Sequence, residues 1–542
     1  MLIKEEKQLS FHSLLYNKIP EQHLLKRIEK AVDFSFVNDL LKDSYCVDFG
    51  RPAKEPELML KLLILQYLYN LSDVKVIEEA SLNLAFLWFL GLNPEDELPD
   101  PSLLAKFRTQ RLKDISLDDV LTEIVRQCVE NGVIKSKEIS VDATHMEANC
   151  TKQVPERIMK HLAKNIHKAL KLDNENIPED IDTNIPDYKS IPDHKTAKET
   201  MKQYLEKTIE DASKYDGEHT KTAIDEAKEV LSDEKFILQK GLRSLVDKEA
   251  RVGRKSKNDD FFGYKVEFSM TTDERIITAL GVHSGEYVDG RDTEKLIDRT
   301  AAAGIDIEEF YGDKAYFRKD ILEMLDDKGI KDYIPVSASV YKIDEELFSY
   351  NKDSDEWICI RGNRTVSCKK KIAGNGRGEK YDVLSYKFKK EDCMNCPYRD
   401  KCIGTKKNKN SAKILQVAAS APIFFEKSQF QKTDEFKEKY KKRSAQEWKN
   451  GEMKRFHGMA KARGWGLRSI TTQAKLTAIA VNLKRIAALI TEILPELSAV
   501  GAEFLLTFFF ILKNTKKFIF LCSFKVKKYA VFQWFRTVPP SF

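Results

Sequence analysis

Four residues in the C-terminal third of the chain have side chains and spacings suited to acting together on a phosphate. Tyr440, Arg443, Glu447 and Lys454 are separated by three, four and seven residues. On a helix that advances about 100° per residue, these spacings place the four side chains in one stripe about 60° wide. A carboxylate flanked by two cations and a phenol suits a site where the acid holds a metal ion and the cations contact phosphate. Such a site needs further carboxylates from elsewhere in the chain.

Two aspartates at the ends of predicted strands can supply them. KEISVDATHM (137–146) is typical of a strand that ends at Asp142, and the strand in IEEFYGDKAY ends at Asp313. Three carboxylates suit Mg²⁺ or Mn²⁺, and two such ions about 4 Å apart can activate a water or a 3′-hydroxyl and stabilise the leaving oxygen of a phosphodiester. Taken singly, an aspartate at a strand end more often caps a turn. A glutamate between cations more often belongs to a surface ion-pair cluster.

The predicted elements around these acids follow the order strand, strand, strand, helix, strand, helix, strand. They occupy residues 137–146, 261–270, 275–284, 292–304, 307–313, 318–329 and 331–337. If the helix with Glu447 is the last element of this series, the order resembles the ribonuclease H-like fold, an α/β class with a mixed sheet. In that fold the strands ending at Asp142 and Asp313 are neighbours. Glu447 is then expected within metal-bridging distance of both aspartates.

The motifs around the three acids resemble those of a known enzyme family. SVDATHMEAN, YGDKAYF and the Tyr-Arg-Glu-Lys spacing look like the three blocks of Asp-Asp-Glu (DDE) transposases of bacterial insertion sequences, most closely the eleven-eighty-two family. GRPAKEPELMLKLLILQYLYNLSD, FFGYKVEFSM and GLRSITTQAKLTAIAVNLKR extend the resemblance over residues 20–490. It implies that Asp142, Asp313 and Glu447 hold Mg²⁺ or Mn²⁺, with two ions expected. It also implies that Tyr440, Arg443 and Lys454 contact phosphates near the cleaved end.

The resemblance further implies what the enzyme does. Such enzymes bind terminal inverted repeats, cleave the DNA ends and join 3′-hydroxyls to target DNA, and the synapsis of two ends favours a homodimer. Two alternatives stay open from the sequence. One is a metal-dependent nuclease without strand transfer, and the other is a domesticated, noncatalytic DNA-binding protein.

A basic helix in the N-terminal region is a candidate DNA-binding element. Residues 20–130 have apolar positions at helical spacing, and the segment after Pro99-Asp100-Pro101-Ser102 predicts a helix. The cations on that segment are Lys106, Arg108, Arg111 and Lys113. A helix–turn–helix with a basic last helix can bind DNA, but helix packing explains the same pattern equally well.

Three cysteines within ten residues indicate a second metal site. Cys393 and Cys396 have the Cys-x2-Cys spacing that lets two thiolates reach one tetrahedral zinc, and Cys402 follows. Cys359 is the first choice for a fourth ligand and Cys368 the second. The alternative is a set of reduced thiols in a small β-rich insertion.

Four other side chains lie near the acidic motifs. We expect His145 to pack at the strand end, His457 to be a solvated helix residue, and Trp448 and Trp465 to lie in the core. The functional alternatives are support of the metal site by His145, DNA contact by His457 and insertion between bases by the tryptophans.

Composition and charge agree with a DNA-binding protein of several domains. The segment 437–468 contains 11 Lys or Arg and 3 Glu, which favours a polyanionic partner. Nine cysteines and an N-terminus without an apolar signal core predict a reduced, intracellular location. The resemblance to bacterial transposases implies the cytoplasm, at the nucleoid. The apolar runs 504–512 and 518–524 are too short to span a bilayer, which takes about 20 residues.

The sequence predicts four regions. They are a helical DNA-binding region at 1–130, a catalytic core at 131–337 plus 431–490 with a helical insertion at about 151–250, a cysteine-bearing insertion at 338–430, and an apolar and basic tail at 491–542.

Overall fold

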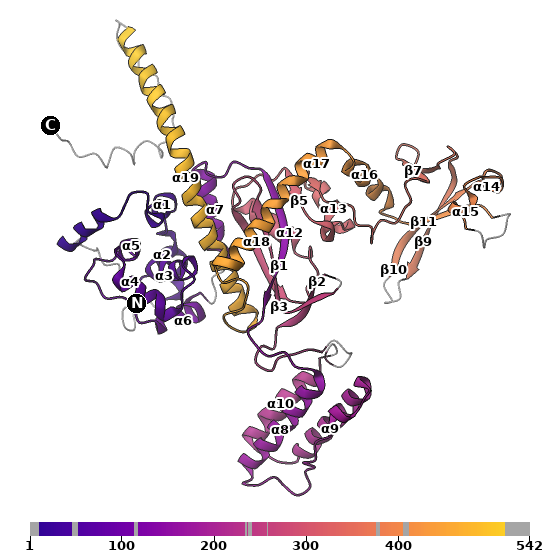
Figure 1. The fold of residues 1–542 in the computed structure, drawn as a ribbon, viewed down its shortest axis with the longest axis horizontal. Helices are drawn as coiled ribbons and strands as arrows, with labels where there is room; N and C mark the ends of the chain where they lie inside the picture. Colours follow the sequence, from indigo (N-terminus) through magenta and orange to yellow (C-terminus); the bar gives the residue numbers. More distant parts are fainter. Residues whose placement is uncertain are drawn as a thin grey trace. The chain divides into compact units, whose positions relative to one another are not determined.

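The computed structural model describes residues 10–514, apart from 46–52, 113–116, 234–235, 237–240, 257, 375–379 and 405–410. The chain divides into two compact units, 1–489 and 490–542. The first unit contains the sheet and the helices around it, and holds every residue discussed as a site (Figure 1).

Helices make up the region before the first strand, as the apolar periodicity predicts. They are α1 (Leu24–Ala31), α2 (Phe36–Leu41), α3 (Pro56–Leu68), α4 (Asp73–Leu82), α5 (Leu84–Phe89), α6 (Ser102–Lys106) and α7 (Leu117–Glu130). Every residue of α3 from Leu58 onward is buried, so this helix is the centre of the region. Ser72 and Asn83 cap α4 and α5 with their side-chain oxygens, which satisfies amide groups at the start of each helix.

A six-stranded mixed sheet follows. Its strands are β1 (Glu138–Glu147), β2 (Arg251–Ser256), β3 (Asp259–Thr271), β4 (Ile277–Ser284), β5 (Glu309–Tyr311) and β6 (Lys331–Tyr333). The order is β2-β3-β1-β5-β6, and β4 also pairs with β3. β3 is antiparallel to β1, β2 and β4, whereas β1, β5 and β6 are parallel. The seven predicted elements are present in the predicted order, with α12 (Thr293–Ala302) and α13 (Lys319–Asp327) between the later strands, and β2 is an additional strand that was not predicted.

The first strand is longer than predicted, because β1 continues to Glu147. Its pairing with the long strand β3 runs from Ile139 opposite Thr271 to Glu147 opposite Gly263. Asp142 therefore lies within the strand, and its prediction as the last residue was wrong. Continuous hydrogen bonding to β3 overrides the polar residues that suggested an end.

Apolar residues of β1 and of the two helices form the core beside the sheet. Ile139 and Val141 of β1 are fully buried with Leu296 of α12 and Leu322 of α13. This packing fixes β1 from one face, and Asp142 and Ser140 belong to the opposite face because side chains alternate along a strand.

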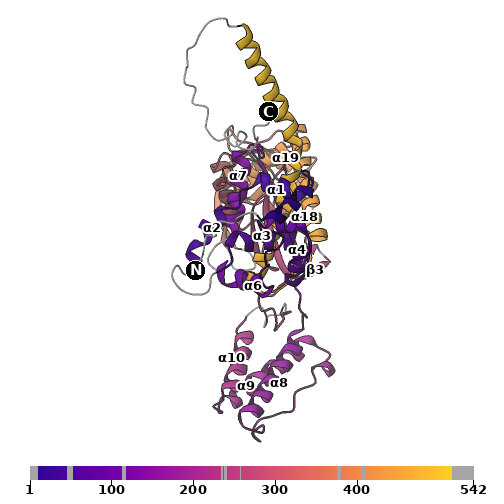
Figure 2. The same cartoon turned by 90° about the vertical axis from the view of Figure 1, so that its left-hand side faces the viewer.

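The helical insertion is a three-helix bundle with a core of its own. Its helices are α8 (Pro155–Asp173), α9 (His194–Ala212) and α10 (Glu218–Leu231), and they lie side by side in both views (Figures 1 and 2). Ile158, Leu205 and Ile224 represent the three helices in this core. Backbone hydrogen bonds between Gln153 and Arg243 join the entry and exit of the insertion.

The cysteine-bearing insertion is rich in strands, as predicted. It contains the hairpin β7 (Phe348–Asn351) and β8 (Glu356–Cys359), a sheet of β9 (Thr365–Gly374), β10 (Lys380–Phe388) and β11 (Ile414–Ala418), and the short helices α14 (Lys390–Met394) and α15 (Arg399–Cys402). Trp357 and Tyr386 are fully buried between the hairpin and the sheet.

A series of helices completes the chain. They are α16 (Ala421–Gln431), α17 (Asp434–Tyr440), the 3-10 turn η6 (Lys441–Arg443), α18 (Ser444–Phe456) and α19 (Gly466–Asn514). The stripe predicted on one helix thus spans three consecutive segments, α17, η6 and α18. None of the described helices is long and apolar enough to cross a membrane. The side chains of 504–512 and all of 518–524 lie outside the described residues.

Candidate active site

The parallel pairing of β1 with β5 gives the first two acids equivalent positions. Ser140 of β1 pairs with Tyr311, the last residue of β5. Asp142 and Asp313 each follow that pair by two residues. The structure therefore brings both acids to the same level of two adjacent parallel strands, within β1 and just beyond the last residue of β5.

Asp142 is a largely buried carboxylate, with 14% of its side chain exposed. Its Oδ1 lies 3.5 Å from Arg443 Nη2, and its Oδ2 accepts a hydrogen bond of 3.2 Å from Asn450 Nδ2. Burial raises the pKa of Asp142 to about 6, Arg443 opposes this shift, and the charge of Asp313 adds to it. An acid whose ionised form is costly to bury favours a nearby cation.

Asp313 begins the 3-10 turn η5 (Lys314–Tyr316). Its carboxylate accepts a hydrogen bond of 2.8 Å from the amide of Ala315, so it caps this turn while facing Asp142 electrostatically. The capping role expected of an isolated aspartate is thus present. The hydrogen bond from Ala315 uses one carboxylate oxygen of Asp313, and the other oxygen takes no part in the cap.

A buried glutamate on β3 holds the segment that follows Asp313. Glu267 is fully buried and accepts hydrogen bonds from Tyr316 Oη at 2.6 Å, Tyr287 Oη at 2.8 Å and Gly290 N at 2.7 Å. Burial raises its pKa, while these three donors oppose the shift. Since Tyr316 follows Asp313 by three residues, this network fixes the turn on which Asp313 lies.

A fully buried hydrogen bond also links α18 to β1. Gln446 Nε2 donates to the carbonyl of Ser140 at 2.7 Å, and both residues are fully buried. The bond sets the height of α18 along β1, two residues before Asp142. α18 lies alongside β1 in Figure 1.

Glu447 does not join the two aspartates. Its side chain is 74% exposed, and its Oε1 lies 3.6 Å from Arg443 Nη1, while the same guanidinium faces Asp142. Within the described parts of the chain, no group of three or more His, Cys, Asp or Glu side chains is placed to hold a metal ion. The expectation of metal-bridging distances from Glu447 to both aspartates is therefore not met. The physical reason is Arg443, which pairs with Asp142 and Glu447 and stands between them.

Arg443 is the electrostatic centre of the cluster. Burial disfavours its charge, but Asp142, Tyr440, Asp313 and Glu447 together raise its pKa. Tyr440 stacks on Phe436, with ring centroids 5.5 Å apart, and its phenol belongs to the same cluster. Burial raises the pKa of Tyr440, the positive charge of Arg443 opposes the rise, and Asp313 and Asp142 add to it. Five of the six residues predicted for the site thus interact around one guanidinium.

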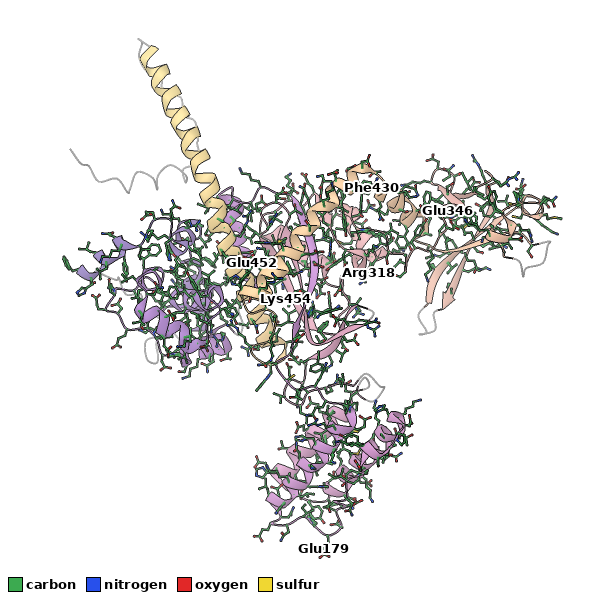
Figure 3. The ribbon with its side chains drawn as sticks, in the orientation of Figure 1. Glu179, Arg318, Glu346, Phe430, Glu452 and Lys454 are labelled. Atoms are coloured by element: carbon green, nitrogen blue, oxygen red, sulfur yellow. The ribbon has the colours of Figure 1, made fainter. Side chains whose placement is uncertain are left out.

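Lys454 lies apart from this centre, next to His145 of β1. Its Nζ is 3.3 Å from His145 Nδ1, and it projects from α18 as labelled in Figure 3. Burial lowers the pKa of Lys454 to about 8, and Lys255 adds to that effect. Burial likewise lowers the pKa of His145 to about 4, with Lys454 contributing. A neutral imidazole can therefore accept a hydrogen bond from the ammonium group and orient it.

The packing predictions for the neighbouring residues have mixed outcomes. The His145 ring packs against the ring of Phe261 in a tilted arrangement, with centroids 5.0 Å apart, in accord with the predicted packing. His457 is 2% exposed and its Nδ1 contacts the carbonyl of Tyr67, so its prediction as a solvated residue was wrong. Trp448 and Trp465 are 53% and 57% exposed, so their assignment to the core was also wrong. Trp448 lies beside Arg275, and Trp465 donates to the carbonyl of Asn149.

Two of the cations in the basic N-terminal segment are held inside the protein. Arg108 pairs with Asp73 at 2.5 Å, and Arg111 donates to the carbonyl of Ser44 and covers the ring of Tyr45. The packing explanation therefore accounts for both residues. Lys106 is exposed, and Lys113 lies outside the described residues.

The four preferred cysteines line one small cavity in the second insertion. Cys359 from β8 lines it together with Cys393, Cys396 and Cys402, which in the described structure are not close enough to form a metal-holding group, whereas Cys368 is exposed on β9 and does not line it. Burial raises the pKa of the Cys402 thiol; nearby Lys413 opposes the rise, and the other three thiols add to it. The amide of Lys413 donates to Cys393 Sγ at 3.5 Å.

Sequence reasoning missed Asn450 and Glu267. Asn450 lies four residues after Gln446, which bonds to Ser140, so helical spacing places it on the face toward β1. Its Oδ1 is buried and has no hydrogen-bond partner in the described structure. Glu267 is the charged residue in the otherwise apolar half of FFGYKVEFSM, and a charge inside a buried strand is a usable signal.

Comparison with known families agrees with this geometry. Residues 13–110 match the family described as "Transposase domain (DUF772)", and residues 358–487 match "Transposase DDE domain". A comparison with curated proteins finds no match. The second match contains Tyr440, Arg443, Glu447 and Lys454.

These two matches support a DDE transposase, a metal-dependent enzyme of DNA cleavage and strand transfer. More particularly, they indicate the DNA transposase of an insertion sequence. Its partner is accordingly DNA, and the family implies dependence on a divalent metal ion.

Proposed function

We propose that the sheet is the ribonuclease H-like core of the transposase and that Asp142, Asp313 and Glu447 are its catalytic carboxylates. The sheet supports the fold, because β3 is antiparallel to β1, β2 and β4, and β5 and β6 follow on the other side of β1 as parallel strands. The observation that carries the site is the register of β1 with β5, which gives Asp142 and Asp313 equivalent positions beyond the Ser140–Tyr311 pair.

The donor set suits Mg²⁺ or Mn²⁺, and we propose two ions. The carboxylate of Asp142 is largely buried beside Asp313, and Asn450 Oδ1 is a buried oxygen without a partner in the described structure. Oxygen donors of this kind are those that hard divalent cations prefer. Bound at Asp142, Asp313 and Glu447, the ions supply charge that activates the attacking oxygen and stabilises the leaving one.

The cationic residues have separate tasks in this proposal. Arg443 offers a planar fork that suits a phosphate, and Tyr440 adds a hydroxyl beside it. A phosphate at Arg443 competes with Glu447 for the guanidinium, and Glu447 is exposed enough to change its rotamer without repacking. Lys454, oriented by His145, binds a phosphate further along β1.

The reaction is phosphoryl transfer at the ends of the element. The N-terminal region recognises the terminal inverted repeats, the core cleaves each end, and the 3′-hydroxyls are joined to target DNA. Two chains act together as a homodimer because two ends must be held at once. The same site in a nuclease would hydrolyse the ends without joining them.

Single carboxylate variants test the catalytic assignment. In Mg²⁺, D142N and D313N should lower end cleavage by at least about a thousandfold, and E447Q should do the same although its side chain is exposed. Binding of the end duplex should persist in all three. An E447Q enzyme with the wild-type rate would leave Glu447 as a mere surface partner of Arg443.

A second proposal concerns the cysteines. We propose that Cys359, Cys393, Cys396 and Cys402 hold a structural Zn²⁺, because four thiols from three separate segments line one cavity. Metal analysis of reduced protein should give one zinc per chain, and C393S should lose it. C368S, which alters a thiol outside the cavity, should keep it. Protein without zinc, or equal zinc loss in both variants, would refute the assignment.

A further inference from the structure

One face of the helical insertion carries four cations and a histidine at helical spacing. The exposed residues of α8 include Arg157, His161, Lys164, Lys168 and Lys171, which follow each other at intervals of four, three, four and three. Residues at these intervals form one row along a helix. At about 1.5 Å per residue, the row is about 21 Å long. We call these five residues the α8 row.

The α8 row has no carboxylate partner in the described structure. None of its five side chains forms a hydrogen bond or an ion pair with another described residue. The two acids of α8 point elsewhere, since Glu156 is buried and Asp173 accepts two hydrogen bonds from Thr220. Like charges four residues apart destabilise a helix, so an unpaired row is kept at a cost that an anionic partner would relieve.

The other two helices of the bundle have no excess of basic over acidic residues. α8 contains five Lys or Arg and two acids, whereas α9 has four of each. α10 has two lysines and four acids. The positive charge is therefore concentrated on one helix of the bundle, where a general solubility role would spread it over all three.

We propose that the α8 row binds the phosphate backbone of duplex DNA. The proposal rests on the transposase function and adds a contact surface to it. Along about 21 Å, one strand of duplex DNA presents about six phosphates, which is enough for contacts by the four Lys or Arg side chains of the row and for His161 between them. Lysines without base-reading partners bind backbone charge, so the contact is independent of sequence.

The test compares two pairs of neutralised lysines in the full-length protein. K164Q/K168Q removes two charges from the α8 row, and K221Q/K228Q removes two exposed lysine charges from α10 as the matched control. Affinity for a labelled duplex of random sequence is measured between about 50 and 200 mM salt. Thermal unfolding confirms that both variants are folded.

The row predicts a specific change in salt dependence. For K164Q/K168Q, the slope of log affinity against log salt should become shallower by about two, because each phosphate contact contributes about 0.9. Wild-type affinity should consequently fall about tenfold further than that of the variant over this salt range. K221Q/K228Q should keep the wild-type slope. Equal slopes for the two double variants would overturn the proposal.

Two other results would have different meanings. If wild-type protein binds the duplex without salt dependence, DNA binding itself fails, and with it the proposed function. If the slope stays unchanged but K164Q/K168Q alone alters self-association, the row faces the acidic α10 of a second copy, and the DNA proposal is overturned. End cleavage at saturating protein should match wild type in K164Q/K168Q, which separates this surface from the catalytic carboxylates.

Discussion

At the residue scale, the site is arranged around the contacts of Asp142. Arg443 lies against one of its oxygens and Asn450 donates to the other. The acid types could be predicted from the sequence because their motifs are local. The position of Glu447 could not, since it depends on how the Arg443 guanidinium divides its contacts between two carboxylates.

Asn450 should act as a positioning residue for Asp142. N450A removes the 3.2 Å hydrogen bond and should lower the single-turnover cleavage rate by about 10- to 100-fold, as loss of supporting contacts does in metal sites. DNA affinity should not change, because Asn450 is not cationic. Titration of Mg²⁺ should show a higher metal requirement in N450A. Wild-type cleavage and metal dependence in this variant would remove Asn450 from the site.

Lys454 should give DNA binding a characteristic pH dependence. Its pKa is lowered to about 8, so the ammonium is charged below that pH and loses its proton as the pH rises through it. Attraction for phosphate should therefore weaken between about pH 7 and 9 in wild type. K454Q should bind more weakly at pH 7 and lose this pH dependence, whereas K454R should bind equally at both values. A K454Q profile parallel to wild type would show that another group titrates.

At the element scale, β1 and α18 together determine the site. The alternation and order of strands could be read from the sequence because each strand has a local pattern. The extension of β1 beyond Asp142 could not, because it follows from pairing with β3, which lies more than a hundred residues later in the chain. The three-part helical path through Tyr440 and Arg443 likewise depends on docking against the sheet.

The hydrogen bond from Gln446 to Ser140 should stabilise this arrangement. Q446L has a similar volume but leaves a buried carbonyl without its donor, so the free energy of unfolding should fall by about 1–3 kcal/mol. E447Q, one residue later and mostly exposed, should change it by less than about 0.5 kcal/mol. Urea denaturation measures both. Equal effects of the two substitutions would contradict the anchoring role.

At the scale of the whole molecule, two insertions extend from a small mixed sheet. Both enter through connections of that sheet, and the helical one leaves from the end of β1 itself. The existence of the insertions could be predicted from changes in composition, such as the high Lys, Glu and Asp content of 151–250. The placement of Cys359 at one cavity with the other three thiols, and the unpaired α8 row, required the fold because the residues concerned are placed by packing.

The most direct test of the central claim is a strand-transfer assay with a pre-cleaved end. The substrate is a pre-cleaved duplex made from the DNA that flanks the gene, and joined product on target DNA is measured in Mg²⁺. Wild type should join the 3′-hydroxyl to the target, whereas D142N should bind the same end and yield no joined product. Hydrolysis without joining by wild type, or joining by D142N at the wild-type rate, would contradict this account.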